Sequence, residues 1–450
     1  MPTIDVHKVA DSSRFNKFHG LILFWGVLIL IIDGYDLAIV GAALPSIMEE
    51  MGVDATQAGF MASSALFGMM VGAMLLGTIA DRVGRRLAIC ISVVLFSVFT
   101  AAAGLASDPI TFSVLRFIAG LGIGGVLPIM TAQMAEFAPG KLRSRLVTLV
   151  FAGYSIGGIL VAAVGKQLIE SWGWESVFYT AGLPVLLIPF IIRTMPESMP
   201  FLIKTGRIDE LRGTVVRLAP EAHVTRETVF TAPAGRGDAP ISGLFQDGRG
   251  FSTVMIWLAF FMGLFMTYAL SSWLTKLMAL SGYSLGSALN FVIVFNLGAM
   301  IGAVFGGWLG DRYNIKTVLI IFYAVGAISL TLMGYTRSTE LLFLVVFVVG
   351  ASTLGTQLLA YAYAGSFYPV EIRSTGVGFA SGVGRAGAIL APIVIGVIVS
   401  LNLPLEQNFM VIALAGLLGM IAVIMIDHRR SAIVVEADLP AATAPNEKLA

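Results

Sequence analysis

Two aspartates and two arginines lie well inside apolar stretches of the chain, where charge is costly: Asp33, Asp36, Arg116 and Arg385. Carboxylates in such surroundings are tolerated when they face a cavity, pair with a cation or take up a proton. Asp33 and Asp36 are three residues apart, which places them on one face of a helix, and each raises the proton affinity of the other. This chemistry suits a site that loads and releases protons. The alternative is a structural pair that binds an arginine or caps a helix break at Gly34.

The two arginines supply the complementary chemistry, which is the binding of an anion. Arg116 lies about as deep in its apolar stretch as Asp36 and keeps its charge, so it needs a carboxylate from the chain or from a substrate. Arg385 is flanked by Gly384 and Gly387, small residues that admit close approach of a helix or a ligand. Because guanidinium and carboxylate match in a two-pronged geometry, Arg385 is the first choice for holding a substrate carboxylate. A permanent salt bridge between helices is the alternative for both arginines.

The elements that position these residues must be membrane helices. Of the 450 residues, 57% are hydrophobic and only 12% are charged, which leaves too little polar surface to cover a water-soluble core. Apolar runs long enough to cross a bilayer occur at 18–44, 57–79, 87–106, 109–133, 146–168, 176–195, 252–275, 284–309, 315–335, 340–363, 374–400 and 407–427. The sequence therefore predicts an all-α integral membrane protein with twelve transmembrane helices in two six-helix bundles.

The spans divide the chain into four parts. Residues 1–195 are predicted to form the first bundle, and 196–250, rich in charge and proline, a central loop outside the membrane. Residues 251–430 are predicted to form the second bundle, and 431–450 a disordered tail. Lysine and arginine gather in alternate connections between spans, whereas acidic residues dominate the others. By the positive-inside rule, both termini and the central loop are expected in the cytoplasm of a multi-pass protein of the cell (inner) membrane.

An internal repeat relates the two halves. A shift of 230 residues aligns GTIADR (77–82) with GWLGDR (307–312), FAPGKLRS (137–144) with FYPVEIRS (367–374), and GGIL (157–160) with GAIL (387–390). Three matches at one offset indicate two homologous six-helix units in parallel orientation. Such a repeat is a transporter architecture, because it leaves a central site between two similar bundles that can rock about it.

The motifs that carry this repeat resemble those of a known family. GTIADRVGRR (77–86) and RFIAGLGIGG (116–125) are similar to two motifs of the major facilitator superfamily. Within it, IIDGYDLAIVGAALPSI (31–47), PES (196–198) and GRAGAILAP (384–392) resemble the aromatic acid:proton symporters, which import benzoate-like carboxylates. The resemblance supports a proton-coupling role for Asp33 and Asp36 with Arg116.

The resemblance also implies a set of gating residues at the cytoplasmic edge. In the first copy of the loop motif these are Gly77, Asp81, Arg82 and Arg85, and in the second Asp311 and Arg312. Residues that flank the repeated FxP and RS segments are expected to form gate salt bridges: Glu136, Arg143, Glu371 and Arg373. Topology signals for the loop arginines, and simple solvated helix ends for the flanking residues, are the alternatives.

An aromatic substrate calls for ring faces in the cavity. The first candidates for ring faces that contact the substrate are Tyr35, within the aspartate motif, and Trp273. Further candidates are Tyr268, Phe291 and Phe295. Packing between helices or a position at the membrane interface is the alternative for each.

The function expected from these residues is secondary active import of an aromatic carboxylate, benzoate or a hydroxybenzoate, by proton symport through alternating access. A proton symporter of another small organic acid and a drug:proton efflux antiporter of the same fold are the alternatives. The chain has one cysteine, Cys90, and lacks a nucleotide loop, a metal cluster or a nucleophile with a partner base. We therefore expect no enzyme, no cofactor and no nucleic-acid partner, but a monomer in the lipid bilayer.

Overall fold

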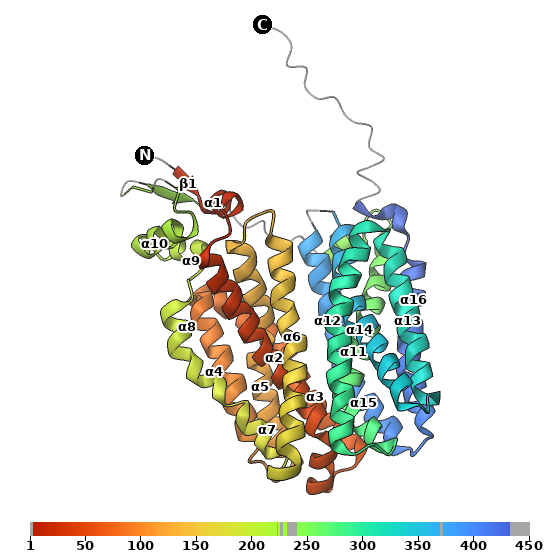
Figure 1. Cartoon of the computed structure of the whole chain (residues 1–450). Coiled ribbons are helices and arrows are strands. Elements are labelled where there is room, and N and C mark those ends of the chain that lie inside the picture. Colours follow the sequence, from red (N-terminus) through yellow and green to blue (C-terminus); the bar gives the residue numbers. More distant parts are fainter. Residues whose placement is uncertain (1–2, 223, 226–227, 232–240, 370–371, 433–450) are drawn as a thin grey trace.

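The molecule consists of two helical bundles that stand side by side (Figure 1). The computed structural model describes residues 3–222, 224–225, 228–231, 241–369 and 372–432, so most of the tail predicted at 431–450 lies outside the described residues. Within the described part, twelve helical spans are long and apolar enough to cross a membrane. The predicted all-α membrane class is confirmed.

Each bundle contributes six of these spans. The first consists of α2 (Lys17–Met51), α3 (Ala55–Val83), α4 (Arg85–Ala103), α5 (Pro109–Phe137), α6 (Arg143–Trp172), and a sixth span made of α7 (Glu175–Thr180), η1 (Leu183–Leu187) and α8 (Ile188–Thr194). The second consists of α11 (Gly250–Leu280), α12 (Leu285–Arg312), α13 (Ile315–Tyr335), α14 (Thr339–Phe367), α15 (Arg373–Ser400) and α16 (Leu405–Met425), followed by the short turn η3 (His428–Arg430). Pro184 and Pro189 open η1 and α8, where their missing N–H groups interrupt the sixth span.

Polar caps start many of the spans. The side chains of Asp54, Asp108, Ser284, Asn314 and Ser338 accept backbone N–H groups in the first turns of α3, α5, α12, α13 and α14. These N–H groups have no partner within the helix, so a capping oxygen there fixes where the helix begins.

The internal repeat recurs in the packing of the bundles. A Cβ added at Gly68 on α3 would lie 2.0 Å from the carbonyl oxygen of Phe117 on α5. At the positions 230 residues later, a Cβ on Gly298 of α12 would lie 2.1 Å from that of Phe347 on α14. Helices this close leave no space for a side chain, so the same glycine contact is used twice.

The described part of the segment between the bundles forms short helices and a strand, most of which pack on the first bundle. It contains α9 (Met199–Lys204), α10 (Ile208–Leu218) and β2 (Val229–Thr231), and β2 pairs in parallel with the N-terminal strand β1 (Thr3–Asp5), which precedes α1 (Val6–Ser12). Apolar side chains of these elements join the core of the first bundle: Val6, Ala10, Leu202, Leu211, Leu218 and Phe230. The turn η2 (Ile241–Phe245) contacts α11 and α15 of the second bundle instead.

We call the end of the molecule that carries β1 and α10 the terminal face, and the other end the opposite face (Figure 1). The bundles touch in the half nearer the opposite face. There Ser63 on α3 donates a hydrogen bond of 2.6 Å to the carbonyl oxygen of Ile389 on α15. A Cβ at Gly59 would lie 2.5 Å from the carbonyl oxygen of Pro392. One at Gly41 on α2 would be 1.9 Å from a carbonyl oxygen of α11.

Candidate functional site

A cavity of about 1090 Å³, part of it open to solvent, lies between the two bundles. The first bundle lines it with α2, α3, α5 and α6, and the second with α11, α12, α14 and α15. On α5, α6, α12 and α14 the lining residues belong to the half of the helix nearer the terminal face. The cavity thus begins near the middle of the membrane and extends towards the terminal face, while the contacts described above close the opposite side.

Asp33 lines this cavity from α2. Its side chain is buried, with 2% of the residue exposed, and its Oδ1 atom has no hydrogen-bond partner among the described residues. The helix can pass so close to α6 because Gly34 follows, where a Cβ would lie 2.1 Å from the carbonyl oxygen of Tyr154. An unpaired carboxylate at this depth is the arrangement expected for a group that binds a proton or a cation.

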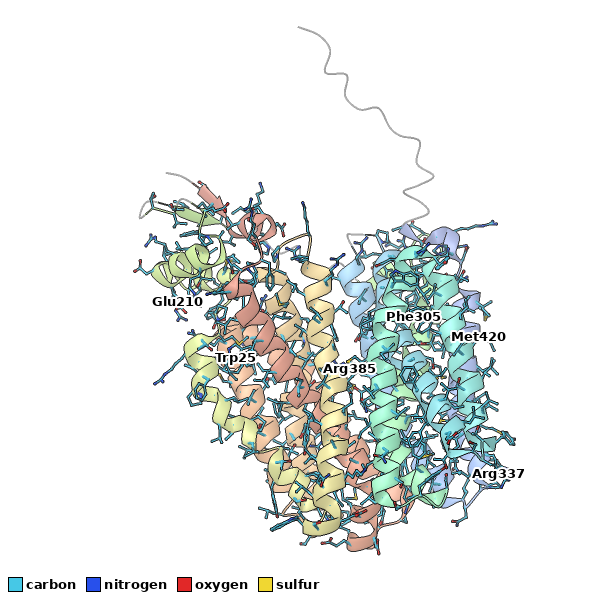
Figure 2. All side chains as sticks on the ribbon, viewed as in Figure 1. Trp25, Glu210, Phe305, Arg337, Arg385 and Met420 are labelled. Atoms are coloured by element: carbon cyan, nitrogen blue, oxygen red, sulfur yellow. The ribbon has the colours of Figure 1, made fainter. Side chains whose placement is uncertain are left out.

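Arg385 lines the same cavity from α15 of the other bundle. Figure 2 shows it between the bundles, at about half the height of the helices. Its Nη1 atom is buried and has no hydrogen-bond partner among the described residues. Asp33 and Arg385 attract each other electrostatically, yet no ion pair within 4 Å joins them. The site therefore holds a free cationic donor and a free carboxylate, contributed by opposite bundles.

Asp36 and Arg116 lie together elsewhere, inside the first bundle. Arg116 Nη1 donates to both carboxylate oxygens of Asp36, at 3.1 and 3.0 Å, and to Thr100 at 2.6 Å. Its Nη2 donates to the Asp36 carbonyl oxygen at 3.0 Å. Both charged residues are 1% exposed, and neither lines the cavity. Asp36 is thus paired with Arg116, whereas Asp33, three positions earlier on α2, has no such partner.

The two aromatic residues carried forward from the sequence do not line the cavity. The hydroxyl of Tyr35 hydrogen-bonds to Thr180 at 2.6 Å. Trp273 is fully buried and donates to the carbonyl oxygen of Pro392 at 2.9 Å. Of the further candidates, Tyr268 does line it, whereas Phe291 stacks on Phe343 of α14, with ring centroids 4.2 Å apart.

Rings at the cavity come instead from several helices. Tyr154 and Phe151 project from α6, Tyr268 from α11 and Tyr361 from α14. Tyr154 and Tyr268 are close enough to interact across the two bundles. The cavity therefore joins aromatic surface to the two unpaired charged groups.

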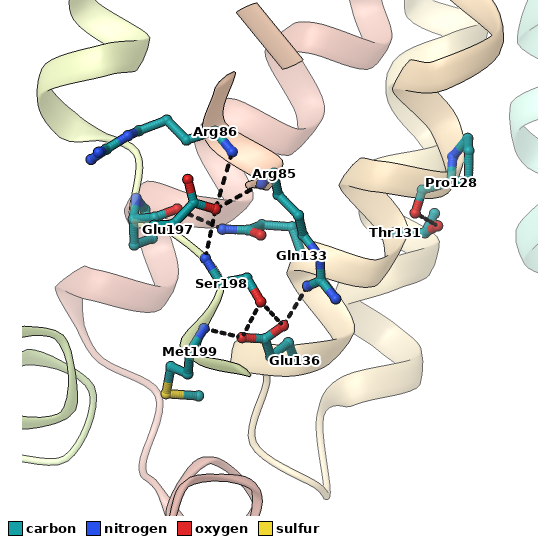
Figure 3. Close-up of polar contacts among 10 residues, drawn as sticks. Arg85, Arg86, Pro128, Thr131, Gln133, Glu136, Glu197, Ser198 and Met199 are labelled. Carbon is teal, nitrogen blue, oxygen red and sulfur yellow. Dashed lines mark hydrogen bonds and ion pairs between the residues drawn. The ribbon is translucent and has the colours of Figure 1, made fainter. Parts of the chain in front are cut away.

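At the terminal face, the first bundle holds a network of polar contacts around Glu136, Glu197 and Ser198 (Figure 3). Glu197 accepts the backbone N–H groups of Arg85, at 2.7 Å, and of Arg86, at 3.3 Å, at the start of α4. A carboxylate there also complements the positive end of the helix dipole. The predicted gating residues Arg85 and Glu136 form an ion pair.

Glu136 is the second centre of this network. Its carboxylate accepts the Met199 N–H at 2.6 Å and the Ser198 hydroxyl at 3.0 Å. Gln133, one turn earlier on α5, donates to the Pro196 carbonyl oxygen at 2.7 Å. The network thus ties α4 and α5 to the start of the central segment within one bundle.

Four gating candidates of the loop motif are exposed: Asp81, Arg82, Asp311 and Arg312. Asp81, Arg82 and Asp311 have no ion pair within the described part of the chain, Gly77 has open space around it, and Arg312 lies over the ring of Trp308, 5.5 Å from its centroid. The aspartates of the two loop motifs therefore have no ion pair with a described residue, whereas Arg85 of the first copy is paired with Glu136.

Arg143 and Arg373 make equivalent contacts in the two halves. Arg143 donates to the Ala138 carbonyl oxygen at 3.5 Å and forms an ion pair with Asp11. Arg373 donates to the Tyr368 carbonyl oxygen at 3.3 Å. Both tie the start of one helix to the end of the preceding one. Glu371, expected near them, lies outside the described residues.

The sequence interpretation missed several residues of these sites, among them Tyr154 and Phe151 on α6. Glu197 was quoted only within the PES motif, although a carboxylate at the end of a span is a candidate helix cap. Tyr361 and Gln357 line the cavity from α14. A glutamine in the middle of an apolar span was the available signal for Gln357, because a buried amide needs a partner.

Known proteins resemble the chain along its length. The profile of the Major Facilitator Superfamily matches residues 26–306 and 287–445. The benzoate transport protein of Acinetobacter baylyi is 40% identical over 435 residues, which are 95% of this chain and 93% of that protein. The 4-hydroxybenzoate transporter PcaK of the same organism is 34% identical, over 86% of each chain. Among solved structures, the inward open conformation of the E. coli xylose transporter XylE superposes with a TM-score of 0.71 at 18% identity, covering 93% of this chain and 99% of that one.

Proposed function

The chain belongs to the Major Facilitator Superfamily and is a membrane transporter rather than an enzyme, and we propose that it imports a small aromatic carboxylate, benzoate or a hydroxybenzoate, together with a proton. The relatives that transport benzoate and 4-hydroxybenzoate support the substrate class. One observation carries the proposal: Asp33 and Arg385, from opposite bundles, face one aromatic-lined cavity with unpaired polar atoms.

Arg385 holds the substrate carboxylate in this proposal. Its guanidinium has a buried donor with no protein partner, and a carboxylate accepts such donors in a two-pronged, charge-assisted geometry. Tyr154, Tyr268 and Tyr361 offer ring faces to the aromatic part of the substrate. Arg116 is the weaker candidate, because both of its Nη atoms already donate to Asp36 and it does not line the cavity.

Charge balance couples the proton to the substrate. One carboxylate, Asp33, and one guanidinium, Arg385, line the cavity, so a bound anion adds an uncompensated negative charge in a poorly solvated place. A proton on Asp33 removes that charge and frees Arg385 for the substrate. Asp33 is thus the proton carrier, and Asp36 with Arg116 maintains the bundle that positions it.

Alternating access follows from where the bundles touch. We place the terminal face in the cytoplasm, since the loop arginines gather there, so the cavity opens inward and Ser63, Gly59 and Gly41 close the outer side. The likeness to the xylose transporter XylE supports the two-bundle fold on which this proposal depends. Asp81 and Asp311, exposed here, engage as latches when the bundles close at the cytoplasmic side. One chain holds both halves of the cavity, so we propose a monomer in the inner membrane.

Transport by the purified protein in liposomes tests the proposal. We expect labelled benzoate or 4-hydroxybenzoate to accumulate when the lumen is made alkaline and only to equilibrate when the pH gradient is collapsed. In Asp33→Asn the amide keeps the size of the carboxylate but cannot cycle a proton, so accumulation is lost while exchange of internal for external substrate continues.

The substrate panel distinguishes this function from its alternatives. Acetate and lactate test a symporter of other organic acids, and a cationic dye tests a drug antiporter. Accumulation by Asp33→Asn at the wild-type level would exclude Asp33 as the proton carrier. Failure of every aromatic carboxylate to enter, with uptake of an aliphatic acid or expulsion of the dye, would overturn the function.

A further inference from the structure

Gln357 on α14 is a third unpaired polar group in the cavity, and the transport function above assigns it no task. It is 6% exposed, lines the cavity and has no hydrogen-bond partner for either Oε1 or Nε2 among the described residues. A buried amide without partners is costly, because both the donor and the acceptor lose their bonds to water. Such a group in a binding cavity is expected to meet its partners on the ligand.

The position of Gln357 relative to Arg385 follows from a hydrogen bond between their helices. The hydroxyl groups of Tyr361 on α14 and Ser381 on α15 lie 2.7 Å apart, which fixes the register of the two helices. Gln357 is four residues before Tyr361, and Arg385 is four residues after Ser381. The helices run in opposite directions, so both residues lie one turn further towards the opposite face. Gln357 and Arg385 are thus neighbours at the same depth of the cavity.

We propose that Gln357 is a specificity-determining residue that recognises a hydroxyl group on the ring of the carboxylate held by Arg385. This inference rests on the proposed function. A ring hydroxyl is both a donor and an acceptor, so it can donate to Oε1 and accept from Nε2. A second carboxylate on the ring could only accept a hydrogen bond from Nε2, and an unsubstituted ring would bond to neither atom. The preferred substrate class is therefore a benzoate with a hydroxyl at the 3 or 4 position.

The hydroxyl at the 2 position is excluded by its own chemistry. In 2-hydroxybenzoate the hydroxyl proton bonds internally to the neighbouring carboxylate, so the hydroxyl cannot donate to Gln357 Oε1. This compound is consequently a matched ligand control, with the same atoms as the other two isomers.

The test measures equilibrium binding of benzoate and the three hydroxybenzoates to the purified full chain in detergent. Gln357→Met keeps the length of the side chain and removes both hydrogen-bonding atoms. We expect its affinity for 3- or 4-hydroxybenzoate to fall about threefold to tenfold relative to benzoate. The ratio of the affinity for 2-hydroxybenzoate to the affinity for benzoate should stay the same as in the wild type.

Thr356→Val is the matched control on the same helix. Thr356 is fully buried, and its hydroxyl, like the amide of Gln357, has no partner among the described residues, but it does not line the cavity. The variant should leave all the ligand ratios unchanged. If Gln357→Met does not insert or fold, the shorter amide of Gln357→Asn is compared instead, and the wild type is titrated with 4-methoxybenzoate. The methoxy group cannot donate, so it should bind about threefold to tenfold more weakly than 4-hydroxybenzoate.

The outcomes separate this inference from the transport function. Aromatic carboxylates that bind the wild type, with hydroxybenzoate ratios unchanged in both Gln357 variants, would overturn the role of Gln357 and leave the function standing. Equal shifts in Thr356→Val would overturn it as well, since the effect would then come from the helix and not from the amide. A wild type that binds none of the four ligands would overturn both.

Discussion

Two aspartates of α2, three residues apart, have opposite surroundings. Asp36 is held by four contacts of Arg116 and Thr100, whereas one oxygen of Asp33 meets no protein donor. A fixed ion pair has no reason to exchange its proton during transport, but an unpaired carboxylate beside a cavity can. The two aspartates of this motif therefore have different roles, and substitutions of each should distinguish these roles.

Asp36→Asn is expected to reduce stability more than binding. It leaves Arg116 buried with a neutral partner, and breaking a buried pair costs about 3 to 5 kcal/mol. Thermal unfolding in detergent should show a lower melting temperature than for the wild type, with benzoate affinity of the folded fraction little changed. Asp33→Asn is the control, because it breaks no ion pair. Equal melting temperatures for Asp36→Asn and the wild type would contradict the structural role.

Arg385→Lys is expected to bind the substrate poorly although it keeps the charge. A lysine offers a point charge where the carboxylate needs a planar fork, and loss of a charge-assisted pair is worth about 1.5 to 3 kcal/mol, or roughly ten- to a hundredfold in affinity. Titration with benzoate measures the change. Normal binding by Arg385→Lys together with failure of a folded Arg116→Lys would show that the two arginines are assigned in reverse.

The sequence identified the charged residues of the site but not their partners. Hydrophobicity and length predict the spans, and the cost of charge in an apolar stretch singles out Asp33, Asp36, Arg116 and Arg385. Which carboxylate meets which arginine depends on the rotation of α2 against α5 and α15, and helical periodicity alone does not set that rotation. For the same reason Tyr35 was predicted to line the cavity, although its hydroxyl bonds to Thr180.

Among the elements, the start of α4 depends on a residue over a hundred positions away. Glu197 is buried and accepts two N–H groups of the first turn of α4, while Gly84, with a positive φ of 95°, lets the chain turn before it. A Cβ on Gly84 would lie 2.5 Å from the Glu197 carboxylate. The turn and its distant cap therefore form one unit, which joins the central segment to the first bundle.

Glu197→Gln should weaken this unit. The amide can still accept hydrogen bonds but loses the charge that complements the helix end, so we expect a loss of about 0.5 to 2 kcal/mol in stability. Thermal unfolding measures it. Glu210→Gln is the matched control, because Glu210, on α10, is partly exposed and forms ion pairs with Arg86 and Arg207. A control that destabilises as much as Glu197→Gln would argue against the cap.

At the scale of the whole molecule, glycines decide how closely the bundles meet. Gly59→Ala should move the population away from the conformation described here, because its Cβ would lie 2.5 Å from the Pro392 carbonyl oxygen across the interface. Gly378→Ala, on α15 with open space around it, should leave the population unchanged. Distances between spin labels on the two bundles at the terminal face measure the shift, and an unchanged distribution in Gly59→Ala would contradict the closed contact.

The composition of the contact at the opposite face determines how this contact responds to changes in ionic strength. The ion pairs within the described part of the chain all join groups of the same bundle or of its neighbouring segment. The two bundles meet through hydroxyls, glycines and carbonyl oxygens, and the charged Lys166 of α6 donates to a neutral partner, Asn290 of α12, at 3.2 Å. Dissolved salt screens charges but does not loosen close backbone packing. Added salt on that side of the membrane should therefore leave the closed contact intact, and any dependence of the transport rate on electrolyte should arise at the side where the cavity opens.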